Sequence, residues 1–441
     1  MTVVIPMEER YHRTPDGSLW TQGAHAYSFW QRYLTVFDGV RVVARVLEVS
    51  EPTARATRVD GRGVECFPIP YYVGPVQFLK RAWAVRSAVR RSVEATDAVI
   101  MRVSGTIANL LEPTLTAAKR PYGLEVIGDP YDVYAPGAVQ NPMRAFFRWW
   151  FPSALRRQCA GAAGVAYVTE RTLQKRYPCA AYSVGMSDVV LNEDALVSSS
   201  PVFTTHYSSV ELGNDDTLQG TRNIHDPRKP VELVTVGSLE QPYKGVDVLI
   251  RATAKCIAAG RDIRLTIVGD GRYRASLEQL VKQLGIGNSV RLTGQLTSAH
   301  DVRCVLDNSD LFVLASRTEG LPRAMIEAMA RGLPCIGTRV GGIPELLDPN
   351  EMVAPNDADA LASKIGETLS RPEHMMELSA RNLQKARGYR AELLDARRKQ
   401  FFQHIRDVTE QWLCKCEMKP HVYDAGGQSH EKREVFRLEV R

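Results

Sequence analysis

From Val231 onward, apolar and polar positions follow one another in a regular rhythm. Short apolar runs rich in β-branched residues end in Gly or Ser and are separated by amphipathic segments of helix length. "VELVTVG" (231–237), "IRLTIVG" (263–269) and "SDLFVLAS" (309–316) are three such runs. This alternation is typical of a doubly wound parallel sheet. We therefore predict an α/β domain over residues 231–395.

The first half of the chain contains a weaker version of the same pattern. The runs "GVRVVARVLEV" (39–49), "DAVIMRVS" (97–104), "YGLEVIGD" (122–129) and "AGVAYVT" (163–169) read as strands, and residues 75–95 read as a helix. We predict a second Rossmann-like α/β domain over residues 1–187. Residues 188–230 are rich in Ser, Thr, Asn and Asp and should contain the interdomain linker.

The C-terminal region is predicted to be helical. After Pro372 a helical pattern runs to about residue 413, and we expect residues 396–419 to form a final helix that packs back on the first domain. Residues 420–441 read as a polar tail. The total of 441 residues exceeds the size at which one hydrophobic core keeps growing, which agrees with two domains.

Charge and cysteine usage narrow the class of protein. A net charge of +6, spread along the chain, favours anionic small partners or a lipid surface and argues against a nucleic-acid binder. The eight cysteines lack paired metal-ligand spacing, as expected for reduced thiols. No signal-peptide pattern and no apolar run of roughly 18 residues is evident. We expect a cytoplasmic protein.

The predicted parallel sheet indicates where a ligand should bind. Ligands of such sheets bind outside the carboxyl ends of the strands. After the strand that ends at Ser316 the chain turns and enters a helix near Pro322, whose free N–H groups would attract a phosphate. Glu319 precedes this helix end and Glu327 lies about two turns further on. Alternatively, Glu319 is a solvated cap and Glu327 pairs with a neighbouring arginine.

Four segments together carry a family resemblance. They are "EGLPRAMIEAMARGLP" (319–334), "VGSLEQPYKGVDVLIRA" (236–252), "IVGDGRYRASLE" (267–278) and "GTRVGGIPELL" (337–347). The sequence resembles retaining glycosyltransferases of the family-four type, the group 1 glycosyl transferases. This resemblance implies a GT-B fold, in which two Rossmann-like domains face each other across a cleft. It covers about residues 231–369 and is only architectural over the first half.

The resemblance implies a role for each matched residue. Glu319 would contact the hydroxyls of the donor sugar and Glu327 those of the ribose, since a carboxylate accepts two hydrogen bonds from a diol. Lys244 would neutralise the pyrophosphate, the alternative being a surface lysine in a turn. The resemblance also implies further donor-binding residues, which supply backbone amides near the helix end or belong to the loops that cradle the phosphates and the base. They are Gly320, Leu321, Arg323, Gly237, Ser238, Gln295 and Leu296.

Two positions depart from the family pattern. Ser238 stands where many relatives carry an arginine, so Arg317 and Arg323 are candidates to replace that cation. In the first domain, relatives have a glycine-rich loop after the first strand, for which Gly23 is the counterpart, with His25 beside it. Asp129 stands near the position of the family's histidine and is our catalytic candidate there; alternatively it is a turn former before Pro130.

The implied activity is transfer of a sugar from a nucleoside diphosphate sugar to an acceptor hydroxyl with retention. The acceptor would be a surface polysaccharide or lipid-linked glycan. UDP is favoured over GDP as the nucleotide, and neither a metal nor a cofactor is expected. The alternatives are a nucleotide-sugar epimerase and a nucleotide-sugar-binding protein without catalysis. A dehydrogenase is disfavoured because no G-x-G-x-x-G follows the first strand.

Residues 144–157 interleave four arginines with Phe and Trp. Such a helix can lie on an anionic membrane, which would place the enzyme peripherally at the inner face of the cell membrane. The alternative is a buried helix with snorkelling arginines.

Overall fold

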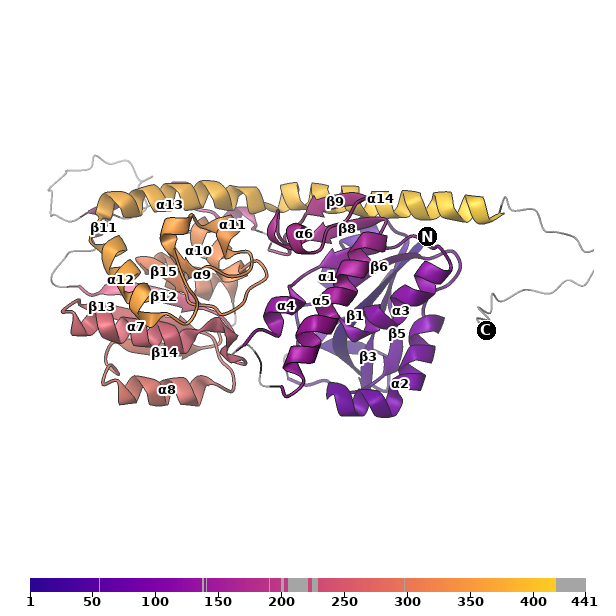
Figure 1. The fold of residues 1–441 in the computed structure, drawn as a ribbon, viewed down its shortest axis with the longest axis horizontal. Coiled ribbons are helices and arrows are strands. Elements are labelled where there is room, and N and C mark those ends of the chain that lie inside the picture. Colours follow the sequence, from indigo (N-terminus) through magenta and orange to yellow (C-terminus); the bar gives the residue numbers. More distant parts are fainter. Residues whose placement is uncertain are drawn as a thin grey trace, which may run out of the picture.

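A computed structural model describes residues 1–54, 56–136, 139, 141–189, 191–199, 202–204, 221–223, 229–296 and 298–417. It consists of two α/β domains placed side by side, with two long C-terminal helices lying along one edge of both (Figure 1). The predicted tail, residues 420–441, and much of the predicted linker segment lie outside the described residues. Within the described part, no helix is long and apolar enough to cross a membrane.

The first domain is built on one large sheet. Its strands are β1 (Thr2–Arg13), β2 (Leu19–Thr21), β3 (Gly39–Glu48), β4 (Thr57–Arg58), β5 (Val64–Pro70), β6 (Ala98–Val103), β7 (Gly123–Val126), β8 (Gly164–Tyr167) and β9 (Tyr182–Gly185). The order β5-β3-β1-β6-β7-β8-β9 is parallel throughout, whereas β2 and β4 add antiparallel pairs beyond β1. The sheet is therefore mixed, not purely parallel as expected.

Helices cover both faces of the first sheet. They are α1 (Tyr27–Trp30), α2 (Gly74–Arg91), α3 (Thr106–Ala117), α4 (Pro130–Val133), α5 (Arg144–Gly161) and α6 (Thr172–Arg176). Buried side chains of α2, α3 and α5 share one hydrophobic cluster with the sheet, so these three helices lie on the same face. The other face packs Trp30 and Tyr33 against side chains of the final helix.

The second domain contains a fully parallel sheet. Its strands are β12 (Val231–Val236), β13 (Ile263–Val268), β14 (Val290–Gly294), β15 (Leu311–Leu314), β16 (Cys335–Thr338) and β17 (Met352–Val353). Its helices are α7 (Val246–Ala258), α8 (Arg274–Gln283), α9 (Ala299–Asp307), α10 (Arg323–Ala330), α11 (Ile343–Leu346), α12 (Ala358–Leu369) and α13 (Pro372–Ala386). The strand order is β14-β13-β12-β15-β16-β17, the doubly wound arrangement that the sequence pattern predicts. Two further short strands, β10 (Val202–Thr204) and β11 (Thr221–Asn223), pair with each other.

The chain passes between the domains at two adjacent points. One crossing includes Leu191, and the other is the break between α13 and α14 (Ala391–Glu417), where a 3₁₀ turn and Gly388 interrupt the continuous helix that we expected. Leu191 donates to the carbonyl of Tyr389, and Ala391 donates to the carbonyl of Leu191. The second crossing thus lies before residue 395, which the sequence pattern predicted as the end of the second domain.

Helix α14 completes the first domain. Phe401, Phe402 and Ile405 are fully buried in its core. Strands β7 and β8 both begin with glycine, and a Cβ on Gly123 would lie 2.8 Å from the Ile405 side chain. The glycines therefore allow the helix to approach the sheet closely.

Candidate active site

The topological switch point of the second sheet lies between β12 and β15. From β12 the chain winds one way to β13 and β14, and from β15 it winds the other way to β16 and β17. The loops that leave neighbouring strands at such a point diverge and leave room for a ligand. Lys244 comes from the loop after β12, and Glu319 from the loop after β15. The structure thus brings together two residues that lie 75 positions apart.

Lys244 and Glu319 form a buried ion pair at this switch point. The Nζ atom of Lys244 lies 2.7 Å from Oε1 of Glu319, and the two side chains are 17% and 7% exposed. The hydroxyl of Ser316, which is fully buried, donates to the same carboxylate oxygen at 2.7 Å. A buried carboxylate needs such partners, since an unpaired charge is costly to desolvate. The arrangement offers one cation and one carboxylate, held in place, to a polar ligand.

Glycines bring the loops around this pair into close backbone contact. A Cβ on Gly341, whose φ is +52°, would lie 1.9 Å from the carbonyl oxygen of Glu319. A Cβ on Gly245, whose φ is +63°, would lie 1.9 Å from the carbonyl oxygen of Ala315. The N–H of Gly342 also donates to the carbonyl of Gly320 at 2.7 Å. Only glycine suits these positions, so the backbone itself fixes where Glu319 and Lys244 stand.

Helix α10 begins at Arg323, three residues after Gly320. Arg323, its first residue, has a side chain that is 63% exposed, and its Nε lies 3.9 Å from Oε1 of Glu327 one turn along. Burial raises the pKa of Glu327, and Arg323 and Arg303 act in the opposite direction. A half-buried carboxylate with one distant ion-pair partner is available to accept hydrogen bonds from a diol.

The two candidate replacement cations behave differently. Arg317 donates to both carboxylate oxygens of Asp247, at 2.9 and 2.7 Å, and to the side chain of Asn356 at 2.6 Å. It therefore clamps the loop that carries Lys244 and has little left for a ligand. Arg323 remains exposed and keeps its guanidinium group accessible. Ser238 is exposed, and its hydroxyl accepts from the N–H of Glu240 at 3.2 Å.

The remaining predicted donor residues line the same edge of the second sheet. Gly237 follows β12, and a Cβ on Gly269 would lie 1.9 Å from its carbonyl oxygen. Gln295 is exposed and Leu296 half-buried, directly after β14. A cavity of about 650 Å³ adjoins Lys244 and is also lined by Gln241, Tyr273 and Arg317.

The loop after β15 also meets the first domain. A Cβ on Gly320 would lie 3.2 Å from the carbonyl oxygen of Ile127, which follows β7. Leu321 packs against apolar side chains of both domains. The carboxylate of Glu345 on α11 accepts hydrogen bonds from the backbone N–H groups of Glu170, Arg171 and Thr172, at 2.6 to 3.0 Å. The sequence did not single out Glu345, because its partners are residues of another domain.

Asp129 caps helix α4. Its carboxylate accepts from the N–H of Tyr131 at 2.9 Å and from the hydroxyl of Tyr177 at 2.5 Å, and it is ion-paired with Arg176. The side chain is almost fully buried. Both oxygens are engaged, so in this structure the carboxylate has the role of the turn and cap that the sequence left as the alternative.

Gly23 and His25 lie beside strand β1. This strand runs to Arg13, well past the end of its neighbour β6, and the chain then returns through β2. Gly23 follows that return, and His25 Nδ1 lies 2.7 Å from Oε1 of Glu9. Burial acts to raise the pKa of Glu9, but hydrogen bonding and charge interaction with His25 lower it overall.

The first domain has its own switch point, which the sequence analysis missed. It lies between β1 and β6, and the strand register places Glu8 opposite the end of β6. The Glu8 carboxylate accepts from the N–H of Ile107 at 2.8 Å and lies 3.2 Å from Arg45, whose guanidinium group stacks 4.7 Å from the ring centre of Tyr72. No residue of β1 was a candidate from the sequence, because the sheet order that brings Glu8 opposite the end of β6 is not visible in the sequence pattern.

Among the described residues, no group of three or more His, Cys, Asp or Glu side chains could hold a metal ion.

Comparison with known proteins shows what the chain is similar to. Residues 230–371 match the family model described as Glycosyl transferases group 1. Protein CapJ of Staphylococcus aureus is 24% identical over 386 residues, which cover 87% of this chain and 90% of CapJ. The putative colanic acid biosynthesis glycosyltransferase WcaL of Salmonella typhimurium is 35% identical over 172 residues, 37% of this chain and 42% of WcaL. The match to WcaL therefore spans less than half of that protein.

Solved structures share the two-domain architecture. Sucrose-phosphate synthase from Thermosynechococcus elongatus superposes with a TM-score of 0.64 at 16% identity, over 92% of this chain and all of that one. WaaG, a glycosyltransferase involved in lipopolysaccharide biosynthesis, gives 0.57 at 16% identity over 92% and 99%. Anabaena HepE in complex with UDP gives 0.55 at 15% identity over 95% and 100%. The second domain thus matches the group 1 glycosyltransferase family model, and the fold of the chain is GT-B, as the resemblance implied.

Proposed function

We propose that the protein transfers a sugar from a nucleoside diphosphate sugar to an acceptor hydroxyl, with retention of configuration and without a metal ion. The observation that carries this proposal is the buried Lys244–Glu319 pair at the switch point of the second sheet. Lys244 would neutralise the charge that develops on the leaving diphosphate. Glu319 would accept hydrogen bonds from hydroxyls of the donor sugar.

The other contacts to the donor would come from residues at the same edge of the second sheet. The N–H groups of Gly320, Leu321 and Arg323 at the start of α10 would bind the diphosphate, which the helix dipole favours. Glu327 would bind the ribose, one turn along the helix. The base would lie against Gln295 and Leu296. UDP is our preferred nucleotide over GDP, in line with the complex that HepE forms.

The acceptor would enter from the first domain. Glu8 at the first switch point, 3.2 Å from Arg45, offers a carboxylate to an acceptor hydroxyl. Asp129, our initial catalytic candidate, would act by fixing α4 through its buried hydrogen bonds. The leaving phosphate would then take the proton of the acceptor. The description of WcaL as a putative colanic acid biosynthesis glycosyltransferase supports an acceptor in polysaccharide synthesis.

Domain closure would exclude water from the donor. The two adjacent crossings at Leu191 and Tyr389 form the natural hinge. In the absence of an acceptor we expect slow hydrolysis of the donor, since water then reaches the anomeric carbon.

Donor hydrolysis tests this proposal. Nucleotide-sugars are incubated with the protein, and the released sugar is followed by NMR at early times. Retention predicts that it first appears in the anomeric configuration of the donor. Initial release of the opposite anomer would contradict retention. Binding without hydrolysis or transfer, even with lipid-linked acceptors supplied, would favour a nucleotide-sugar-binding protein.

A further inference from the structure

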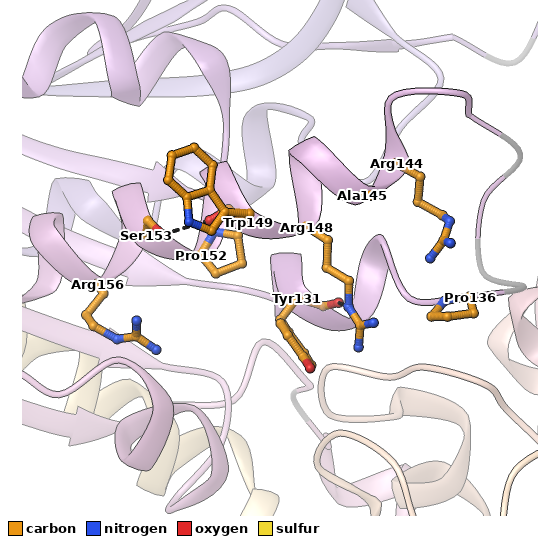
Figure 2. Close-up of a pocket in the computed structure, with 9 residues that line it drawn as sticks. All are labelled: Tyr131, Pro136, Arg144, Ala145, Arg148, Trp149, Pro152, Ser153 and Arg156. Atoms are coloured by element: carbon orange, nitrogen blue, oxygen red, sulfur yellow. Dashed lines mark hydrogen bonds between the residues drawn. The ribbon is translucent and has the colours of Figure 1, made fainter.

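An acceptor hydroxyl is oriented when an atom of the protein accepts a hydrogen bond from it. A groove of about 430 Å³ along α5 is lined by Arg144, Arg148 and Arg156, and neither a carboxylate nor an imidazole lines it in the described part of the chain (Figure 2). Guanidinium groups only donate hydrogen bonds. The charged groups of this groove therefore cannot orient a hydroxyl through its hydrogen, and we looked for accepting atoms elsewhere in the first domain.

The end of strand β1 lies at the edge of the first sheet that faces the second domain. After β7, the carbonyl oxygen of Ile127 lies 3.2 Å from where a Cβ on Gly320 would be. After β8, backbone N–H groups bind the carboxylate of Glu345. Strand β1 runs in the same direction as β6, β7 and β8, so its carboxyl end lies at this edge as well. Groups at the end of β1 are therefore placed for a ligand between the domains.

A bulge in β1 directs two neighbouring carboxylates. Pro6 pairs with Val43 and Arg10 with Arg45, so β1 takes four steps where β3 takes two. Arg45 holds the bulge through its backbone, since it donates to the carbonyls of Glu8 at 2.8 Å and Glu9 at 3.4 Å. Bulges next to functional sites often re-aim side chains. Here Glu8 binds the N-terminal end of α3, and Glu9 binds His25.

His25 is fixed by its neighbours in a way that leaves one ring nitrogen free. Its Nδ1 lies 2.7 Å from Oε1 of Glu9, its carbonyl accepts from Nε1 of Trp30 at 3.2 Å, and its ring packs edge-on against Phe29 with 4.5 Å between the ring centres. An ionised carboxylate only accepts, so Nδ1 carries the proton and Nε2 of the neutral ring is an acceptor. Among the described residues, Nε2 has no hydrogen-bond partner.

The loop before His25 leaves this pair accessible. The side chains of His25 and Glu9 are 16% and 27% exposed. A Cβ on Gly23 would lie 3.7 Å from Oε2 of Glu9, so the loop passes directly beside the carboxylate. Gly23 and Ala24 are both small and exposed, and neither covers the pair with a long side chain.

We propose that His25 binds a hydroxyl of the acceptor through Nε2 and that Glu9 fixes the tautomer and orientation of its ring. Glu8, the neighbouring carboxylate, supplies a second accepting atom at the same strand end. The ligand class is therefore a compound with several hydroxyls, such as a sugar. His25 orients the hydroxyl and takes no proton from it, since the leaving phosphate has that role. That this compound is the acceptor of a transfer rests on the proposed function, whereas binding of a sugar hydroxyl by His25 does not.

NMR of the histidine ring nitrogens in the full chain tests the binding without any turnover. At neutral pH we expect a protonated Nδ1 and a bare Nε2 for His25, and a mixture of tautomers in Glu9→Gln. The probes are the methyl glycosides of glucose, galactose and mannose. At least one of them should shift the Nε2 signal of His25 and leave that of His374 unchanged, because His374 also pairs with a carboxylate but lies on α13. A protonated Nε2, or no shift with any of the three, would overturn the proposal.

Two variants separate hydroxyl binding from a structural role of His25. His25→Asn can keep the hydrogen bond to Glu9 but has no atom at the position of Nε2, whereas His25→Gln places an amide near that position. Both lose the ring contact with Phe29. In hydrolysis of UDP-glucose or UDP-galactose, where water takes the place of the acceptor, we expect kcat to fall about tenfold for His25→Asn, the loss of one hydrogen bond. KM for the donor should not change, and His25→Gln should retain most of the rate.

The kinetic outcomes have distinct meanings. Equal losses in both variants would assign His25 to packing alone, and a fully active His25→Asn would remove it from the acceptor site, so either result would overturn the proposal. His374→Asn is the matched control and should hydrolyse the donor like the wild type. A wild type that hydrolyses neither donor but still shows the Nε2 shift would count against the proposed function alone.

Discussion

The two switch points of this molecule are built in different ways. In the second domain, glycines bring backbone against backbone around Lys244 and Glu319, so a single added Cβ would collide with a carbonyl oxygen. In the first domain, long side chains define the corresponding point, with Glu8 held by the N–H of Ile107 and by Arg45. A site fixed by backbone suits a constant ligand part such as a diphosphate. A site fixed by side chains can change with the acceptor.

The largest effect on activity is expected when the charge of Glu319 is removed. Glu319→Gln keeps the volume and can still accept from Ser316, but loses the charge that pairs with Lys244. We expect kcat/KM for transfer or donor hydrolysis to fall on the order of 10²–10³-fold, as for removal of other groups that stabilise a transition state. Glu240→Gln, an exposed residue of the same domain, is the control. Full activity of Glu319→Gln would remove Glu319 from the site.

A second variant tests the backbone contact without touching a charged residue. Gly341→Ala places a Cβ against the Glu319 carbonyl at a residue with φ of +52°. We expect destabilisation of at least about 2 kcal/mol and a large loss of activity. Gly287→Ala, where a Cβ would meet nothing within 4 Å, should have little effect in the same denaturation and activity assays. Similar results for both variants would show that the close contact is unimportant.

The interdomain contact should have a smaller effect. Glu345→Gln retains one carbonyl oxygen but loses the charge that three backbone N–H groups of the first domain face. We expect KM for the donor to rise a few-fold with a smaller change in kcat, because closure is weakened and the reacting groups are not. Steady-state kinetics measure this, and a fall in kcat alone would assign Glu345 to the chemistry instead.

The smallest expected effect concerns Glu327. Its raised pKa means that the ionised carboxylate costs stability in the free protein. Glu327→Gln should therefore gain a little stability, absent below the ordinary carboxyl pKa of 4.5 and complete above the raised value. Nucleotide binding should weaken at the same time. Melting temperatures between pH 4 and pH 8 measure the first effect, and a gain that shrinks as pH rises would contradict it.

The same contrast explains how much could be predicted from the sequence. The donor-side candidates lie in a few contiguous loops of a regular βα pattern. Position in that pattern pointed to Glu319 and Glu327, and the family resemblance implied Lys244. The ion pair and the close glycine contacts depend on which loops become neighbours, which periodicity does not specify.

The first domain could not be predicted to the same depth. Strand β1 carries Glu8 and Glu9 and extends past the end of its neighbour β6. Its functional positions are set by sheet order, a nonlocal property. Asp129 illustrates the limit: its cap of Tyr131 is local and was open to prediction as a turn, whereas its buried contact with Tyr177 joins residues 48 positions apart.

The most direct test of the central claim compares nucleotide binding by the wild type and by Lys244→Ala. Binding is measured as a thermal shift with UDP, GDP, ADP and TDP, with and without EDTA. The account predicts that one nucleotide, UDP by preference, stabilises the wild type regardless of EDTA, and that Lys244→Ala loses most of that stabilisation. Equal stabilisation of both proteins, or stabilisation that EDTA abolishes, would contradict a metal-free diphosphate site at the Lys244–Glu319 pair.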